Sequence, residues 1–246
     1  MIIFTRKLNF KIFAAALLFT LVSCSAQISA TLAADASAGA ELNASIGTQT
    51  AALIRSLAAV SARGADSGAA APVLDGPALS RSLSRSPGIT QADLRNRTPE
   101  RIAGTIKIGA IGDLLAADRT AQVTRQVFRY DAAGRRLAIH FDRTIAPKAL
   151  LLLSAEASDY LSALMAPAAT GEALGKTEYR ALVRSIYGEA IAAEIDAGKI
   201  TVTLTLPGQV LSSKGGSFQG RVARFEIPLI DLLVLEQAID YEVTWQ

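Results

Sequence analysis

Residues 200–206 read Ile-Thr-Val-Thr-Leu-Thr-Leu and decide the fold class. Apolar side chains alternate with threonines, and this period of two predicts a β-strand with one buried and one solvated face. Two later stretches share the period: 223–227, through Phe225, and 239–245, which ends at Trp245. The C-terminal part of the chain is therefore expected to form an antiparallel sheet.

Two alternating runs near the start of the mature sequence, 27–32 and 40–46, flank the turn-forming residues 35–39 and predict a hairpin. A helix follows, with Thr48 as its N-cap and apolar residues at helical spacing, namely Leu53, Ile54, Leu57 and Val60. This helix is expected to lie on the apolar face of the hairpin.

The middle of the chain continues with strands and helices. Strands are predicted near 91–96 and over 101–111, and a second hairpin over 122–142 turns at 131–134. Helices are predicted at four further places: 77–86, 147–153, Ser154 to Met165, and 229–235.

The clearest helix spans 177–197, where one stripe is apolar and Gly198 is placed as the C′ residue. Together these patterns predict an α+β fold, in which an antiparallel sheet built from hairpins carries helices packed on one side.

The composition is that of a globular chain. It has 246 residues, of which 50% are hydrophobic, and a single cysteine. These values exclude collagen, a disulfide-stapled miniprotein and a highly charged disordered chain. Residues 61–76 are small and turn-rich, which indicates a loop or an internal linker.

The first 23 residues have the pattern of an export signal. Arg6, Lys7 and Lys11 precede the apolar run 12–22. As a helix this run covers about 16 Å, roughly half the hydrocarbon thickness of a bilayer, so it is too short to span one. We expect residues 1–23 to be a signal peptide, which leaves 24–246 as the exported domain.

The apolar run ends in Leu21-Val22-Ser23-Cys24, which resembles the lipobox of bacterial lipoprotein precursors. The resemblance implies that signal peptidase recognises Leu21, Val22 and Ser23, and that Cys24 becomes the acylated first residue. The alternative is an ordinary signal peptide with Ser23 or Ala26 as the small cleavage residue. Ser25 replaces the Asp that retains enteric lipoproteins at the inner membrane, so outer-membrane attachment is favoured.

Loss of residues 1–23 also changes the charge balance. It removes three basic residues and no acidic ones, so that 25 basic residues fall to 22, against 22 acidic residues. The mature chain is neutral. Its charge therefore gives no support to nucleic-acid binding, which needs a positive field on the folded protein.

Residues 171–177, Gly-Glu-Ala-Leu-Gly-Lys-Thr, end like a phosphate-binding loop. Three residues separate the two glycines where that loop needs four, and Pro167-Ala168-Ala169 precedes them instead of a strand. We interpret the segment as a loop that leads into a helix, with Thr177 as cap or first-turn residue. No nucleotide and no cofactor is expected.

Residues suited to catalysis or metal binding are sparse. His140 is the only histidine, which excludes paired-histidine metal sites. It is out of phase with the apolar residues of its strand and is expected to face solvent beside Asp142. Asp240 and Glu242 share one face of a predicted strand and are interpreted as solvated surface. No catalytic residue and no metal site is assigned.

Two glycine-containing pairs, Pro207-Gly208 and Gly215-Gly216, bracket a segment between two predicted strands. We interpret them as turn residues, because proline ends a ladder and glycine adopts positive φ. The alternative is that Pro207, Gly208, Gly215 and Gly216 frame a binding loop on a rigid sheet.

The lipobox, the strand-turn-strand pattern over 28–46 and the closing pattern over 203–229 resemble the LppM-like group of bacterial envelope lipoproteins, and also uncharacterised spirochaete lipoproteins. The closing pattern places Thr-Leu-Thr-Leu-Pro-Gly before Gly-Gly and Ala-Arg-Phe-Glu-Ile-Pro-Leu. The resemblance implies an α+β lipid-anchored domain with lipid or glycolipid binding, and it supplies no catalytic residues. Actinobacterial members of the group add a C-terminal membrane helix that this sequence does not show.

These observations favour a non-enzymatic, lipid-anchored envelope lipoprotein. Its partners are expected to be the membrane, through acyl chains on Cys24, and an amphiphile, a glycan or an envelope protein, but not a nucleic acid. A structural or assembly component of the envelope is the second hypothesis. A carboxylate-dependent envelope hydrolase is the third, and it predicts facing carboxylates of which at least one has a raised pKa.

Overall fold

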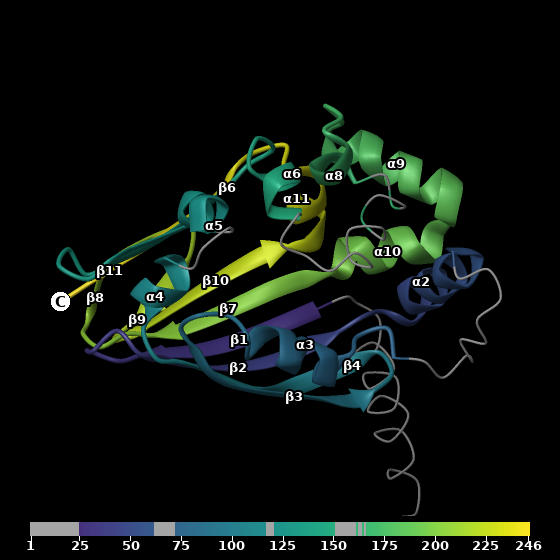
Figure 1. Cartoon of the computed structure of the whole chain (residues 1–246). Helices are drawn as coiled ribbons and strands as arrows, with labels where there is room; N and C mark the ends of the chain where they lie inside the picture. Colours follow the sequence, from purple (N-terminus) through teal and green to yellow (C-terminus); the bar gives the residue numbers. More distant parts are fainter. Residues whose placement is uncertain (1–24, 62–71, 117–120, 151–160, 162–163, 165) are drawn as a thin grey trace, which may run out of the picture.

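The computed structural model describes residues 25–61, 72–116, 121–150, 161, 164 and 166–246. Within these ranges eleven strands form two sheets, one of seven strands and one of four. The predicted α+β class is confirmed. Instead of one sheet, the strands build two, and the helices lie around them (Figure 1).

The larger sheet has the strand order β3-β4-β2-β1-β7-β10-β9. All its neighbouring strands are antiparallel except β1 and β7, which are parallel. The predicted first hairpin is confirmed as β1 and β2. The strands are β1 (Ser25–Leu32), β2 (Ala38–Ser45), β3 (Ile89–Thr98), β4 (Arg101–Ile108), β7 (Lys199–Thr205), β9 (Ser217–Gln219) and β10 (Val222–Pro228).

The expected linker over 61–76 does not separate two sheets. Strand β2 precedes it and pairs directly with β4, which follows it. Ser61 is the last residue of one helix and Gly76 the first of the next. Residues 62–71 of this stretch lie outside the described residues.

The smaller sheet has the order β5-β6-β11-β8 and is antiparallel throughout. Its strands are β5 (Phe128–Asp131), β6 (Arg136–Phe141), β8 (Val210–Lys214) and β11 (Ile239–Trp245). The hairpin predicted over 122–142 is only half right, because its first arm begins as the helix α5 (Ala121–Val127). Only the four residues of β5 pair with another strand. The preceding segment, α5, is helical because Ala, Gln and Arg, which favour helices, make up most of it.

The two sheets share one core through their apolar faces. The alternation of β7 turns Val202 and Leu204 toward this core and its threonines away from it. The buried residues of the cluster come from β1, β7 and β10 of the larger sheet and from β8 and β11 of the smaller one: Leu32, Leu204, Leu206, Val210, Ala223, Phe225, Val243 and Trp245.

The helices form a second core at one end of the molecule, in which α9, α10 and α11 pack on one another. The buried turn of helix predicted at 229–235 is confirmed as α11. The helices are α2 (Thr48–Ser61), α3 (Gly76–Leu83), α4 (Ile111–Ala116), α6 (Ala146–Leu150), α8 (Pro167–Thr170), α9 (Lys176–Tyr187), α10 (Glu189–Ala197) and α11 (Leu229–Val234), besides α5.

Helix α2 packs against α10 beyond the ends of the strands (Figure 1). The prediction that it covers the apolar face of the first hairpin is therefore wrong. That face instead points toward the core that the two sheets share, where Leu32 of β1 is buried.

The single helix predicted over 177–197 is two helices. Gly188 lies between them at φ 87° and ψ 169°, a conformation essentially restricted to glycine, and it lets α10 turn back against α9. Gly198 has φ −69°, so it is extended and is not a left-handed C′ residue. Most of the helix predicted from Ser154 to Met165 lies outside the described residues.

Candidate functional site

The larger sheet presents a polar face opposite its apolar one, because successive side chains point to opposite sides. Strand register brings polar residues from distant parts of the chain into rows across this face. One row contains Arg224, Thr203, Ser29, Glu41 and Thr105, and the next contains Val222, Thr205, Thr31, Gly39 and Lys107.

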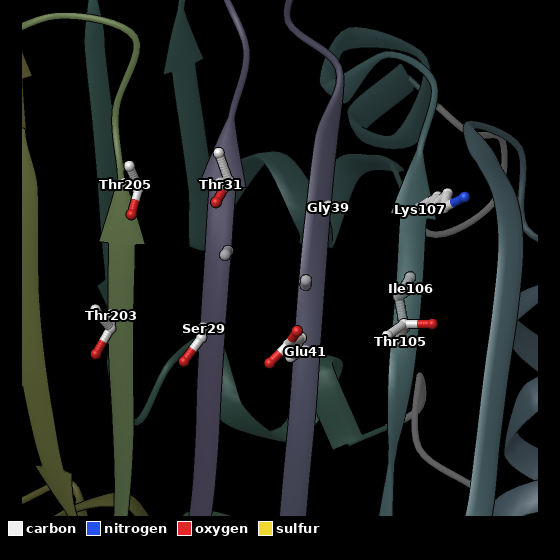
Figure 2. A pocket seen from close by; sticks show the side chains of 11 residues that line it. Ser29, Thr31, Gly39, Glu41, Thr105, Ile106, Lys107, Thr203 and Thr205 are labelled. Carbon is white, nitrogen blue, oxygen red and sulfur yellow. The ribbon is translucent and has the colours of Figure 1, made fainter.

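Apart from Arg224 and Val222 on β10, the residues of these two rows line an open concavity with a volume of about 430 Å³. This volume falls within the usual range of small-molecule sites. Figure 2 shows Thr203 and Thr205 of β7 beside Ser29 and Thr31 of β1. At Gly39 a Cβ atom would meet nothing within 4 Å, so the lack of a side chain there leaves open space in the middle of the concavity.

The hydroxyl groups of the concavity have no hydrogen-bond partner among the side chains and backbone groups that the structure describes. None of the five hydroxyl side chains makes a side-chain hydrogen bond with any residue in the described ranges. Each hydroxyl offers one donor and two acceptor positions. All five can therefore bond to a ligand, and they are Ser29, Thr31, Thr105, Thr203 and Thr205.

Two ionisable side chains, Glu41 and Lys107, also line the concavity. Glu41 is opposite Thr105, two residues from Lys107, so the two charges are diagonal neighbours across β2 and β4. Both side chains are exposed. Their charges cancel, which suits a neutral or zwitterionic polar ligand better than a polyanion.

A second polar cluster lies on the smaller sheet. His140 contacts two carboxylates, with its Nδ1 2.7 Å from Asp240 Oδ1 and its Nε2 3.2 Å from Asp142 Oδ2. The expected position at the surface beside Asp142 is confirmed, since 36% of the side chain is exposed. Asp240 was missed as a partner, because only the pairing of β6 with β11 brings it there.

The three groups of this cluster shift one another's pKa values. The hydrogen bond with Asp240 raises the pKa of His140 against the opposing effect of burial, and the same bond lowers the pKa of Asp240. Burial acts to raise the pKa of Asp142, but hydrogen bonds from Thr144, Ile145 and His140 outweigh it and lower that pKa. Neither carboxyl group has the raised pKa that a general acid needs.

The cluster predicts a small pH dependence of stability. Because the pKa of His140 is raised on folding, its contribution is complete below about pH 6.5 and is lost as the pH rises through the raised value. Because the pKa values of Asp142 and Asp240 are lowered, both carboxylates stay charged, and keep their interaction with His140, until the pH falls below about 4. At pH 5.5 we expect the free energy of unfolding of the wild-type protein to be higher than that of His140→Gln. The difference should be less than about 1 kcal/mol, because the site is exposed.

This difference should shrink toward zero at pH 8.5, and urea unfolding at the two pH values measures it. Lys214, whose Nζ is 3.9 Å from Asp240 Oδ2, is present in both proteins, so its contribution cancels in the comparison. A difference that grows with rising pH would contradict the assignment.

The segment 171–177 leads into α9, as interpreted from its sequence, and Thr177 lies in the first turn. In a phosphate-binding loop the lysine side chain and the backbone N–H groups would bind the phosphate, but here these groups already bind carboxylates. Lys176 Nζ is 2.6 Å from Asp231 Oδ1, and the Lys176 N–H donates to Glu236 Oε2 at 3.1 Å. The N–H of Gly175 donates to Glu178 Oε2 at 3.0 Å and completes the helix cap.

The segment between Pro207-Gly208 and Gly215-Gly216 contains the strand β8 and is not an open loop. Its glycines let backbones approach closely, and Gly215 has φ 78°. These contacts agree with the turn interpretation, and the binding role of the four residues stays a prediction. A Cβ atom at Gly208, Gly215 or Gly216 would lie 2.1, 2.6 or 2.5 Å from the carbonyl oxygen of Gln246, Asp240 or Arg224, respectively.

Glu194 is a fully buried acidic residue that no sequence pattern indicated. Its Oε1 accepts from the N–H of Gln49 at 2.9 Å and its Oε2 from the N–H of Thr50 at 2.8 Å. The carboxyl group of α10 thus satisfies the free N–H groups at the start of α2. Its role is structural, because both oxygens are used within the protein.

Comparison with known proteins gives one distant similarity. No protein-family model matches the chain, and no curated protein matches it. Among solved structures, the chain is similar to the folded domain of LppM from Mycobacterium tuberculosis, determined by NMR, with 11% sequence identity over 92% of each chain and a TM-score of 0.37.

No helix in the described ranges is both long enough and apolar enough to cross a membrane. The lipobox residues Leu21, Val22, Ser23 and Cys24 lie outside the described residues.

Proposed function

We propose that this chain is a non-enzymatic lipoprotein of the bacterial cell envelope, anchored in the outer membrane through acyl chains on Cys24, and that it binds a glycan. The observation that carries the binding proposal is the concavity of about 430 Å³ with its unused hydroxyl groups on β1, β4 and β7. The anchor is supported by the lipobox sequence at residues 21–24.

A glycan fits this surface better than an acyl chain does. Sugar hydroxyls are both donors and acceptors, and so are the serine and threonine hydroxyls that line the concavity. Glu41 and Lys107 add one strong acceptor and one strong donor. An acyl chain would need large apolar side chains around it, and Ile106 is the only large apolar residue among those that line the concavity. The apolar residues Ala30, Ala40 and Ile106 occupy positions whose side chains alternate toward the other face.

The proposal is non-enzymatic because Glu41 is the one acidic residue among those that line the concavity, where a glycosidase would need a pair, and the acidic residues beside His140 lie in β11 and just after β6 of the smaller sheet. Both have lowered pKa values, owing in part to their hydrogen bonds with His140. A glycosidase would need one carboxyl group that remains protonated near neutral pH.

Thr203→Val combined with Ser29→Ala is expected to weaken glycan binding by about 10-fold or more, because each lost hydrogen bond is worth about 1 kcal/mol. Valine has nearly the shape of threonine and favours strands, so the sheet should persist. Calorimetry on the acylated protein in detergent, with soluble peptidoglycan fragments and lipopolysaccharide-derived oligosaccharides as probes, measures the affinity.

Thr177→Val is the matched control, since Thr177 is exposed and lies on α9, outside the sheet. It should bind as the wild-type protein does. Unchanged affinity in the double variant would refute the site. Absence of binding by the wild-type protein would refute glycan recognition itself.

A structural or assembly role is the second candidate function, and one observation favours it. Three large apolar side chains on β8, β9 and β10 are exposed, namely Leu211 at 59%, Phe218 at 47% and Val222 at 36%. Exposed apolar groups of this kind are typical of protein contact surfaces. A wild-type chain that binds neither glycan probe would favour this candidate.

A further inference from the structure

The proposed lipid anchor has a geometric consequence for the folded domain, and this inference rests on that anchor. Strand β1 begins at Ser25, the residue after Cys24. Consecutive Cα atoms are about 3.8 Å apart across a trans peptide bond, whatever the conformation of the residue before the strand. An acylated Cys24 therefore holds the first residue of β1 at the membrane surface without an intervening linker.

Several strands of the larger sheet begin or end beside Ser25. Ser25 pairs with Ser45 of β2 and with Lys199 of β7, and Ser45 pairs in turn with Arg101 of β4. Neighbouring strands are about 4.8 Å apart, so the backbone of Arg101 lies roughly 10 Å from that of Ser25. We call this edge of the domain the Ser25 end. It faces α2 and α10 and lies opposite the C-terminus (Figure 1).

The Ser25 end carries two arginines without an acidic partner in the described ranges. Arg101 begins β4, and Arg97 occupies the irregularity in β3 between Asn96 and Thr98. Both side chains are exposed. A bulge of this kind turns a side chain out of the regular alternation of the strand.

The other cations beside this end are paired. Arg55 forms an ion pair with Glu100, and Lys199 Nζ lies 3.4 Å from Glu226 Oε2. These pairs cancel. Asp75 is the acidic residue that lies beside β3 here, where it caps α3, so Arg97 and Arg101 together leave an excess of positive charge at the Ser25 end.

We infer that the Ser25 end is a docking surface for an anionic lipid bilayer, and that Arg97 and Arg101 bind the phosphate groups of lipid headgroups. A guanidinium group binds phosphate with two parallel hydrogen bonds. Each arginine near an anionic membrane surface strengthens binding about five-fold. The bilayer is the occupant because the anchor would place its headgroups beside Ser25, about 10 Å from the backbone of Arg101 and, one strand further, about 14 Å from that of Arg97, distances that long arginine side chains help to bridge.

This docking would also position the concavity. Along β1, Ser29 is about 13 Å and Thr31 about 20 Å from Ser25, at 3.3 Å per residue. The hydroxyl-lined part of the sheet would then stand clear of the headgroups and remain open to a glycan.

Single-cysteine labelling tests the orientation. Cys24 is the only cysteine, so once it is acylated an introduced cysteine is the only free thiol. Thr48→Cys places a fluorophore three residues beyond Ser45, and Ala34→Cys places it at the turn between β1 and β2; both positions are exposed. The acylated full chain is reconstituted in vesicles of phosphatidylethanolamine and phosphatidylglycerol that carry nitroxide on the headgroups.

We expect loss of most of the fluorescence at position 48 and little loss at position 34. Equal quenching at the two positions, or stronger quenching at position 34, would overturn the orientation. A chain that is not acylated would fail to float with the vesicles, which identifies failure of the anchor separately.

Arg97→Gln with Arg101→Gln, in the Thr48→Cys background, tests the headgroup contacts. Exchange of phosphatidylglycerol for phosphatidylcholine should reduce quenching in the parent protein, and the double variant should show no such dependence. Arg81→Gln with Arg129→Gln removes two exposed arginines from α3 and β5 and should behave as the parent does. A double variant that keeps the full lipid dependence would overturn the assignment of Arg97 and Arg101.

Discussion

Cys24→Ala is expected to abolish palmitate incorporation and to release the chain from the membrane fraction, either as soluble protein or as uncleaved precursor. Each buried CH₂ group of an acyl chain contributes about 0.8 kcal/mol to membrane attachment, so several chains on one cysteine hold a protein firmly. The mature chain is neutral, and exposed charge cannot replace this contribution. Metabolic labelling with palmitate, followed by fractionation, measures both effects.

Ser25→Ala is the matched control for this experiment. It changes the adjacent residue and removes the hydrogen bond of 3.1 Å between the hydroxyls of Ser25 and Ser45, but it keeps the cysteine. It should label and fractionate as the wild-type protein does. Label that persists in Cys24→Ala would refute the lipid anchor, and a wild-type chain without label would favour the ordinary signal peptide.

Strands whose pattern is local were predictable from the sequence. The alternation of threonine with apolar residues identified β7, and two alternating runs around a turn identified β1 and β2. The parallel pairing of β1 with β7 was not predictable, because it joins segments that are far apart in the chain. The division into two sheets depends on the same kind of distant pairing.

Helix patterns failed where backbone conformation or tertiary contacts decide the outcome. The apolar stripe over 177–197 continues through Gly188, so periodicity alone indicates one helix. The positive φ of Gly188 breaks it, and the break depends on the packing of α10 against α9. Helix α2 was predicted correctly in extent, but its amphipathic pattern could not reveal which surface it packs on.

The candidate site could be predicted only in part, because strand pairings between distant segments bring its residues together. Each threonine of β7 was recognisable as part of a solvated strand face. Thr203 and Ser29 become neighbours only through the register of β7 with β1, and Glu41 joins them through β2. Likewise, His140 and Asp240 are 100 positions apart and meet across β6 and β11.

Glu194→Leu is expected to lower the free energy of unfolding by about 3–5 kcal/mol, the largest stability effect predicted for this chain. Leucine has nearly the same volume but cannot accept the hydrogen bonds from the N–H groups of Gln49 and Thr50. Each buried N–H left without a partner costs about 1–3 kcal/mol.

Glu194→Gln separates hydrogen bonding from packing. The amide retains one oxygen that can accept from one N–H, but its NH₂ group then faces the other, so we expect roughly half the loss seen with leucine. The side-chain amide of the variant has no room to move toward Gly47, because the carboxyl group of Glu194 already packs directly against this glycine. A Cβ atom at Gly47 would lie only 2.3 Å from Glu194 Oε2. Urea unfolding followed by circular dichroism gives the free energies.

Glu189→Gln is the surface control on the same helix. The side chain of Glu189 is 70% exposed and pairs with Arg184, so its replacement should change stability by less than about 0.5 kcal/mol. Stability should therefore fall in the order wild type, Glu189→Gln, Glu194→Gln, Glu194→Leu. If Glu194→Leu unfolded at the same urea concentration as Glu189→Gln, hydrogen bonds from α2 to this carboxyl group could not be what holds α2 against α10.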